Sequence, residues 1–156
     1  MNQLPLSITS SSKRESRSQF AALPYRVVDD GVQILLSTSR RTKRWILPIG
    51  WPEDGLTPAQ SAAREAWEEA GVTGVPYDIC LGVYSFEKFV EDAEDLPVVG
   101  LVFPLKVKKV SRTYPEVKDR RRKWFSPKKA AAAVDIPELK RILKTFEPKL
   151  LKGRAA

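Results

Sequence analysis

Histidine is absent from this sequence, and cysteine occurs only once. The absence of histidine excludes Ser-His-Asp and Cys-His catalysis and the zinc sites that are built on imidazole. The single cysteine, Cys80, excludes an internal disulfide and a zinc cluster of thiolates, and its apolar neighbours predict a small buried side chain. Any catalysis must therefore use carboxylates, lysine, arginine, tyrosine or a metal ion that prefers oxygen ligands.

Long hydrophobic runs are also missing. No apolar stretch approaches the roughly 20 residues that span a bilayer, so no transmembrane helix is expected. Residues 1–18 are polar and rich in serine, without the apolar centre of a secretory signal, and they predict a mobile tail. We therefore expect a cytoplasmic location.

Acidic residues are too few to balance the basic ones. The 156 residues include 27 Lys and Arg but only 19 Asp and Glu, which gives a net charge of +8. Such a charge predicts an anionic partner: a nucleic acid, a phospholipid or a phosphate-rich small molecule. The length suits one domain with a sizeable core, and the charge alone leaves the choice of partner open.

Segments rich in β-branched and aromatic residues predict the strands of a sheet. They cover residues 19–28, 31–39, 75–90, 97–110 and 120–125, and a further short strand begins at residue 44. A tight turn joins the first two, and Gly31 is expected to supply its positive φ. The acidic segment 91–95 is expected to be an exposed loop.

A helix is predicted over residues 58–70. Thr57 supplies an N-cap, Pro58 suits the first helical position, and Gln60 completes a capping box. Gly71 is placed to end the helix in the left-handed conformation. Further helices are expected over 127–134 and 136–146. Strands on both sides of a helix indicate an α/β (α+β) domain over 19–148 with a mixed sheet between helices, followed by a tail over 149–156.

Three carboxylates crowd one edge of this helix. At about 100° per residue, Glu65, Glu68 and Glu69 share an arc opposite an apolar face. The apolar face consists of Ala59, Ala63, Ala66, Trp67 and Ala70. Like charges at this spacing, near the negative end of the helix dipole, are unfavourable by a few tenths of a kcal/mol per pair. A solvated face tolerates such penalties, but a carboxylate cluster also suits Mg²⁺ or Mn²⁺. Arg64 flanks this edge and can hold one carboxylate in a fixed orientation.

The segment GWPEDGLTPAQSAAREAWEEAGV resembles the signature of the Nudix hydrolases. That signature is a Gly, five residues, a Glu, seven residues, then Arg-Glu-apolar-any-Glu-Glu-any-Gly-apolar. The agreeing positions are Gly50, Arg64, Glu65, Ala66, Glu68, Glu69, Gly71 and Val72. Leu56 replaces the first Glu, with Glu53 and Asp54 close by to take over its role in the loop. The resemblance extends over about residues 19–146, and the flanks look most like the diphosphoinositol polyphosphate and diadenosine polyphosphate phosphohydrolases.

The resemblance implies a Nudix-type α/β/α sandwich with a central mixed β-sheet. It also implies Mg²⁺-dependent, or Mn²⁺-dependent, hydrolysis of a diphosphate linkage. Glu65 and Glu69 would be the chief metal ligands, and Glu68 would be a further ligand or the base for the attacking water. Glu68, Glu69 and the bracing Arg64 are therefore the candidate catalytic residues. A diphosphate requires such a site because its negative charge repels nucleophiles and must be neutralised in the transition state.

Basic residues near the expected mouth are candidates for binding phosphate, because guanidinium groups match its oxygens. The candidate substrate-binding residues are Arg17, Ser39, Arg40, Arg44, Gly50, Trp51, Arg120 and Arg122, accompanied by Arg41, Lys43, Arg121 and Lys123. Ser39, Arg40 and Arg44 are similar in position to the phosphate-contacting stretch of the diphosphoinositol branch. Solvated surface charge is the alternative for any one of these basic residues.

Aromatic residues divide into core and site candidates. We expect Trp45, Trp67 and Trp124 in the core, whereas Trp51 either stacks on a base or anchors its loop. Tyr84 and Phe86 are further candidates for lining the pocket.

Three functions fit these observations. The first is a Mg²⁺-dependent pyrophosphohydrolase acting on diphosphoinositol or dinucleoside polyphosphates, with no membrane partner. The second is the same chemistry on ADP-ribose, nucleoside triphosphates or capped RNA. The third is a non-catalytic RNA-binding module that uses the basic surface, which the intact acids of the helix disfavour. The sequence indicates no oligomeric state.

Overall fold

The structure, a computed structural model of the chain, describes residues 17–29, 31–88 and 95–151. The strands in this part are β1 (Arg17–Val28), β2 (Gly31–Thr38), β3 (Trp45–Ile46), β4 (Ile49–Gly50), β5 (Val72–Pro76), β6 (Gly82–Lys88), β7 (Leu96–Val110) and β8 (Arg122–Phe125). They form one sheet in the order β3-β2-β1-β7-β5, in which β4 also pairs with β1, β6 with β7 and β8 with β2. β1 and β7 are parallel, and the remaining described pairs are antiparallel.

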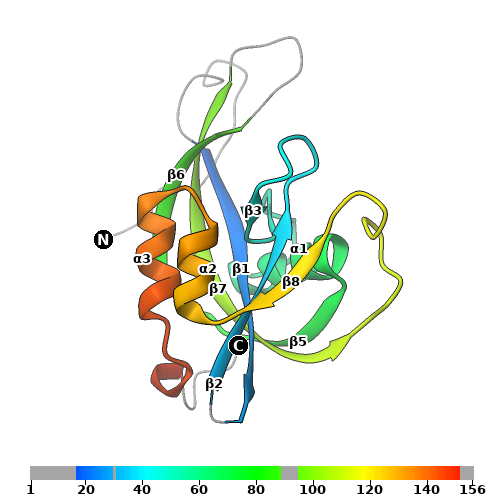
Figure 1. Cartoon of the computed structure of the whole chain (residues 1–156). Helices are drawn as coiled ribbons and strands as arrows, with labels where there is room; N and C mark the ends of the chain where they lie inside the picture. Colours follow the sequence, from blue (N-terminus) through cyan, green and yellow to red (C-terminus); the bar gives the residue numbers. More distant parts are fainter. Residues whose placement is uncertain (1–16, 30, 89–94, 152–156) are drawn as a thin grey trace.

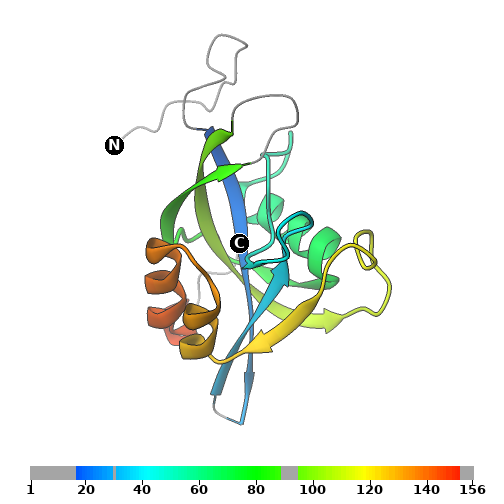
Figure 2. The ribbon, with the colours of Figure 1, turned by 45° about the horizontal axis from the view of Figure 1, so that its top comes forward.

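Helices cover both faces of this sheet. Those that the structure describes are α1 (Pro58–Ala70), α2 (Pro127–Ala133), α3 (Pro137–Thr145) and the 3-10 helix η2 (Pro148–Leu151). α1 packs on one face, and α2 and α3 pack on the other (Figure 1 and Figure 2). None of these described helices is long and apolar enough to cross a membrane. The predicted α/β/α sandwich with a central mixed sheet is confirmed.

Alternate residues of β1 belong to two hydrophobic cores, because successive side chains of a strand point to opposite faces. Phe20 and Ala22 belong to the core under α1. Leu23 and Tyr25 belong to the core under α2 and α3, together with Leu139. Burial on both faces fixes β1, and β4, which pairs with it, carries Ile49 and Gly50 of the candidate site.

The ends of α1 agree with the prediction. The Gln60 N–H donates to Thr57 Oγ1 at 3.2 Å, and the Thr57 N–H donates to Gln60 Oε1 at 3.0 Å, so the capping box is complete. Gly71 ends the helix with a φ of 68°. A Cβ on Gly71 would also stand 2.2 Å from Tyr114 Cδ1, so both its conformation and its packing require glycine.

Two predictions about strands and turns are wrong. The segment 75–90 is divided into β5 and β6, because the long strand β7 pairs with them successively, through residues 105–110 and 96–102. β5 ends at Pro76, which has no N–H to donate. In the turn after β1, the positive φ of 49° belongs to Asp29, whereas Gly31 begins β2. Asp is one of the few residues besides glycine that adopt this conformation readily.

Both ends of the domain extend further than expected. Arg17 and Ser18, which the sequence places in the tail, are the first residues of β1, and residues 1–16 lie outside the described part. Residues 149–151 belong to η2, and Leu151 is buried with 2% exposure. Residues 152–156 and most of the predicted acidic loop, 91–94, also lie outside the described residues.

Several side chains expected in the core lie at its border. Cys80 is exposed, and its Sγ–H donates to the Gly82 carbonyl at 3.4 Å, because it lies in the bend between β5 and β6. Trp45, Trp67 and Trp124 are only half-buried. The indole of Trp124 is covered by the guanidinium of Arg26, which lies 4.0 Å from its ring centroid.

Candidate active site

The turn from β4 into the loop before α1 brings Gly50 against Glu65. A Cβ on Gly50 would stand 2.2 Å from Glu65 Cδ and 2.3 and 2.5 Å from its two oxygens. These distances are far shorter than van der Waals contact, so any side chain at position 50 would displace the carboxylate. Gly50, which the sequence suggests as a substrate-binding residue, acts here by leaving room for Glu65.

Glu69 is buried rather than solvated, with 4% exposure. Its Oε1 accepts the Ile49 N–H at 3.4 Å and lies 3.6 Å from Nη1 of Arg120. The helical periodicity placed Glu69 on a polar edge, but the last turn of α1 lies against β4, which covers this edge. The apolar face and the acidic edge of the helix are therefore both partly buried.

Burial raises the pKa of both carboxyl groups. It raises the pKa of Glu65 to about 7, and the negative charges of Glu68 and Glu53 add to the effect. It raises the pKa of Glu69 to about 8, although the positive charge of Arg120 opposes the rise. Ionising both groups together is therefore unfavourable without an additional cation. Desolvated oxygen donors whose charge is not fully balanced fit a hard divalent cation.

Arg64 lies beside the carboxylates and connects α1 to the preceding loop. Its Nε is 3.1 Å from Glu53 Oε2 and 3.9 Å from Glu68 Oε1. The Glu53 N–H also donates to Ser61 Oγ at 3.3 Å, which ties the loop to the first half of the helix. Arg64, which the sequence predicts to hold one carboxylate of the helix, lies beside Glu68 and has Glu53 as a second and closer acidic partner.

The loop before β8 supplies two more charged groups. Arg120 Nε donates to Glu116 Oε1 at 2.8 Å, and Arg120 Nη1 donates to the Thr38 carbonyl at 3.1 Å. Arg40 Nε is 3.7 Å from the same Glu116 oxygen. Arg120 therefore points inward, with its side chain only 9% exposed, whereas Arg40 stays at the surface.

Lys88, at the end of β6, is a further charged residue near Glu65, Glu69 and Arg120. Burial lowers the pKa of its ammonium group, while the charges of Glu69 and Glu65 raise it. Its Nζ lies 5.7 Å from the ring centroid of Trp51, so Trp51 also borders the site. No sequence pattern points to Lys88 or Glu116, because only the pairing of β6 with β7 and the loop before β8 bring them close to α1.

Within the described residues, no three acidic side chains form a ready-made metal site. Glu65, Glu68 and Glu69 lie together at one end of α1, but Glu68 is drawn toward Arg64 and Glu69 toward Arg120. The predicted ligands are therefore brought together without converging on one point. A cation at this end of α1 would compete with the guanidinium groups of Arg64 and Arg120 for the carboxylates.

The loop between β2 and β3 holds the early basic residues. The Ser39 hydroxyl contacts Thr42 Oγ1 at 2.5 Å and accepts the Arg44 N–H at 3.2 Å, so Ser39 shapes the loop. Lys43 adopts a positive φ of 59°, and its Nζ donates to the Asp119 carbonyl at 3.3 Å. This loop places Arg40 and Arg44 in different surroundings. Arg40 lies near Glu116, whereas Arg44 lines a pocket.

The consecutive basic residues 120–123 contact several different groups instead of forming one phosphate-binding surface. Arg122 Nη1 donates to the Ala70 carbonyl at 2.7 Å, and its guanidinium lies 4.8 Å from the ring centroid of Tyr114. Arg121 lies over the Trp45 ring and Lys123 over the Phe125 ring, at 5.8 and 5.3 Å. Arg122, a candidate substrate-binding residue, caps the end of α1, whereas Arg121 and Lys123 point the other way, because successive side chains along a strand alternate between its two faces. Arg17 is half-buried at the start of β1, in register with Val98.

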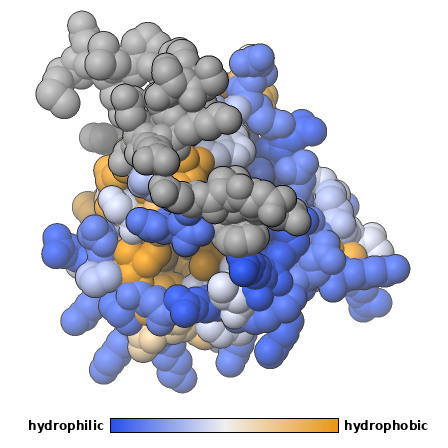
Figure 3. All heavy atoms as spheres, turned by 90° about the horizontal axis from the view of Figure 1, so that it is seen from above, coloured by the Kyte–Doolittle hydropathy of each residue, from blue (hydrophilic) through white to orange (hydrophobic). Residues whose placement is uncertain are grey.

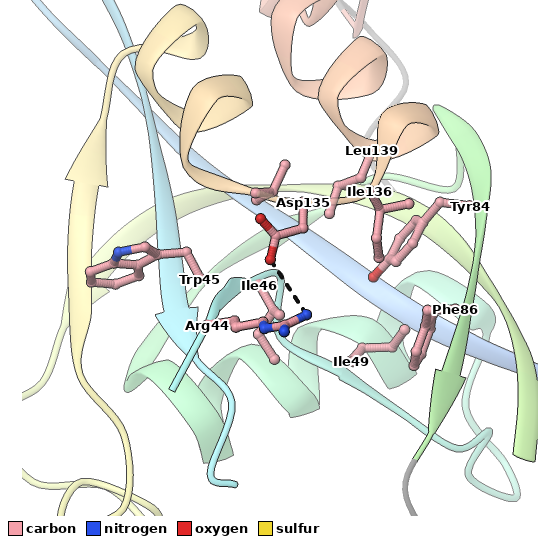
Figure 4. A pocket seen from close by; sticks show the side chains of 10 residues that line it. Arg44, Trp45, Ile46, Ile49, Tyr84, Phe86, Asp135, Ile136 and Leu139 are labelled. Carbon is pink, nitrogen blue, oxygen red and sulfur yellow. Dashed lines mark ion pairs between the residues drawn. The ribbon is translucent and has the colours of Figure 1, made fainter. Parts of the chain in front are cut away.

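A pocket of about 110 Å³ lies on the α2 and α3 side of the sheet (Figure 4). Most of its wall is apolar, formed by Trp45, Ile49, Tyr84, Phe86, Ile136 and Leu139. The rings of Tyr84 and Phe86 stack at 5.6 Å between centroids. The charged lining residues, Arg44 and Asp135, are paired at 3.6 Å. On the face seen from above in Figure 3, hydrophobic residues likewise gather within a hydrophilic surround.

The pocket adjoins the carboxylates. Ile49 lines it while donating its N–H to Glu69. Burial raises the pKa of the Tyr84 hydroxyl well above its usual range, and the nearby charge of Glu69 adds to the rise. Tyr84 and Phe86 line this pocket, and their contact with a substrate stays a prediction.

The family model of the NUDIX domain matches residues 18–146. This chain belongs to the Nudix family. Nudix hydrolase 12, mitochondrial, of Arabidopsis thaliana is 32% identical over 140 residues, which cover 80% of this chain and 69% of that protein. Diphosphoinositol polyphosphate phosphohydrolase 3-alpha of Mus musculus is 32% identical over 111 residues, covering 70% of this chain and 63% of the relative.

Solved structures share the fold. The crystal structure of the Ap4A hydrolase of C. elegans superposes with a TM-score of 0.58 at 21% identity, covering 85% of this chain and 97% of that one. The matching domain and the relatives named as hydrolases identify the chain as a Nudix hydrolase.

One departure from the Nudix signature has a structural account. Leu56 replaces the first Glu of the signature and is 38% exposed. Glu53, three residues earlier, forms the ion pair that joins the loop to Arg64. In this Nudix domain, the loop is therefore connected to α1 by a neighbouring acid.

Proposed function

We propose that this Nudix hydrolase is a pyrophosphohydrolase that uses a divalent metal to cleave a diphosphate linkage in a phosphate-rich small molecule. The observation that carries the proposal is the pair of carboxyl groups of Glu65, which is half-buried, and Glu69, which is buried, because their pKa values are raised to about 7 and about 8. Two ionised carboxylates this close together destabilise the folded protein. Beside Arg120 and Lys88, however, they suit the binding of a cation and a polyphosphate.

Glu65 and Glu69 would hold Mg²⁺ or Mn²⁺, with Glu68 as a further ligand or as the base that accepts a proton from the attacking water. A cation bound there supplies positive charge to the diphosphate and lowers the pKa of a water molecule. Lys88 and Arg40 would bind phosphoryl oxygens beside the carboxylates. Arg64 holds Glu68 in place, and Gly50 leaves the space that Glu65 occupies.

Two substrate classes are considered, because one relative is named for diphosphoinositol polyphosphate and one structure of the same fold is an Ap4A hydrolase. The pocket beside Glu69 favours a dinucleoside polyphosphate. Its stacked Tyr84 and Phe86 rings suit a nucleobase, and its charged residues, Arg44 and Asp135, neutralise each other. An inositol ring crowded with phosphates would instead require several unpaired cations in the pocket.

A substrate panel tests this proposal. The chain is assayed with diadenosine tetraphosphate, diphosphoinositol pentakisphosphate, ADP-ribose, a nucleoside triphosphate and capped RNA, each with Mg²⁺ and with excess EDTA. We expect the highest kcat/KM for diadenosine tetraphosphate and no turnover with EDTA. Turnover confined to ADP-ribose, nucleoside triphosphates or capped RNA contradicts the substrate assignment, and full activity in EDTA contradicts the metal.

Binding of RNA without catalysis is the alternative of another class, and it rests only on the net charge of +8. The hydrolase relatives and the charged centre around Glu69 favour an enzyme. The cytoplasmic location stays a prediction.

A further inference from the structure

Glu116 occupies a fixed position beside the carboxylates of α1, although it belongs to a loop 47 residues after Glu69 in the sequence. Its N–H donates to the Glu68 carbonyl at 2.9 Å, so the end of α1 itself holds this backbone. The Asp119 N–H donates to the Glu116 carbonyl at 3.0 Å, which closes a turn. These backbone contacts place the Glu116 side chain independently of its charge.

The side chain of Glu116 is engaged by arginines. Its Oε1 accepts from Arg120 Nε at 2.8 Å and lies 3.7 Å from Arg40 Nε. Arg120 reaches Glu69 with another nitrogen, Nη1, at 3.6 Å. One nearly buried guanidinium therefore bridges two carboxylates, with the shorter contact to Glu116.

The two carboxylates compete for this guanidinium. A planar guanidinium bound firmly through Nε is restrained in its approach by Nη1, so Glu116 limits how closely Arg120 can pair with Glu69. Without Glu116, Arg120 keeps the contact of its Nη1 with the Thr38 carbonyl at 3.1 Å but loses the restraint on Nε, so the guanidinium can approach Glu69 more closely and neutralise its charge. A neutralised Glu69 is a poorer ligand for any cation.

We infer that Glu116 is a positioning residue that acts through Arg120: it holds the guanidinium away from Glu69 and so keeps that carboxylate available to a divalent cation. This inference rests on the proposed function. Arg40, with its side chain 63% exposed, connects the same Glu116 oxygen to the surface where a polyphosphate arrives. Glu116 is thereby distinguished from Glu65 and Glu69, which would contact the cation themselves.

A double-mutant cycle on metal binding tests the inference without substrate. Binding of Mn²⁺ is measured by titration with paramagnetic detection in the wild type, Glu116→Gln, Arg120→Met and the double variant. We expect Glu116→Gln alone to weaken Mn²⁺ binding about tenfold, and to have less than about twofold effect when Arg120 is Met. The same weakening in both backgrounds overturns the inference, because Glu116 would then act directly on the cation.

Glu53→Gln is the matched control, since Glu53 also lies near Glu65 but pairs with Arg64. Its effect on Mn²⁺ binding should be the same with Arg120 or Met at position 120. If Arg120→Met does not fold, Arg120→Lys replaces it: an ammonium cannot bridge both carboxylates through two nitrogens, so the effect of Glu116→Gln should again shrink below about twofold. An undiminished effect in that background overturns the inference.

Failure of the proposed function gives a different result. A wild type that binds no Mn²⁺ removes both the proposed function and the inference. A wild type that binds Mn²⁺ with additive Glu116 and Arg120 effects removes the inference alone.

Discussion

Gly50 and Glu65 are packed so closely that a Cβ on Gly50 would stand 2.2 Å from Glu65 Cδ. Gly50→Ala should therefore displace the Glu65 carboxylate and lower kcat/KM by about 100-fold or more, while the fold persists. Steady-state kinetics and the thermal midpoint of unfolding measure the two effects.

Gly55 provides the matched control for this variant. It lies in the same loop with a φ of 81°, and nothing lies within 4 Å of a Cβ added there. Gly55→Ala should lower stability by about 1 kcal/mol through its conformation and leave kcat/KM within about threefold. Equal losses of activity in both variants would show that loop conformation, rather than space for Glu65, is responsible.

The stability of the metal-free protein should depend on pH. Glu65 and Glu69 have pKa values of about 7 and about 8 in the folded protein, above the ordinary value of 4.5. The folded state therefore holds protons that the unfolded chain has already lost, so the free energy of unfolding should fall as the pH rises from about 5 to about 8.

Thermal unfolding in EDTA at a series of pH values checks this dependence. Glu69→Gln should flatten the fall, and added Mg²⁺ should raise the midpoint more at pH 8 than at pH 5.5. A wild-type midpoint that rises between these pH values, with the same slope in Glu69→Gln, would contradict the pKa shifts.

Substitutions of Arg40 and Arg122 should have different effects, because Arg40 is expected to bind substrate and Arg122 to stabilise the fold. Arg122 donates to the Ala70 carbonyl at 2.7 Å, so Arg122→Ala should lower the free energy of unfolding by about 1–2 kcal/mol and leave KM within about twofold. Arg40→Ala should leave stability unchanged and raise KM for diadenosine tetraphosphate about fivefold, and for a simpler diphosphate less. Equal KM effects of Arg40→Ala on both substrates would exclude it from phosphate binding.

The presence of Leu56 in place of the first Glu of the Nudix signature should have little effect on activity. Leu56 is 38% exposed, and Glu53 already pairs with Arg64 at 3.1 Å. Leu56→Glu should therefore change kcat less than about threefold, whereas Glu53→Gln should lower it about tenfold by releasing Arg64. A large gain of activity in Leu56→Glu would show that the substitution has impaired this enzyme.

Features set by local physics could be predicted from the sequence. The capping box of Thr57 and Gln60 and the stop at Gly71 depend on neighbouring residues, and both ends of α1 agree with the structure. The division of 75–90 into β5 and β6 depends on which part of β7 each strand pairs with, and no local pattern contains that information.

In the candidate site too, local sequence patterns do not reveal which residues the tertiary fold brings together. Glu65 and Glu69 follow from the signature, but the burial of Glu69 follows from β4, which comes before the helix in the chain. Arg120 and Arg122 look equivalent in a basic run, yet one bridges two carboxylates and the other caps a helix. Lys88 and Glu116 carry no motif, and only the tertiary fold brings them to α1.

The most direct test of the central claim is the turnover of Glu69→Gln with saturating Mg²⁺, measured on diadenosine tetraphosphate beside the wild type and the exposed control Glu138→Gln. Because Gln cannot supply a charged oxygen, kcat should fall by about 1,000-fold or more while the metal-free thermal midpoint at pH 8 stays equal or rises. Glu138→Gln should match the wild type in both measurements. Near-normal turnover in Glu69→Gln would contradict the assignment of this carboxylate to the catalytic metal.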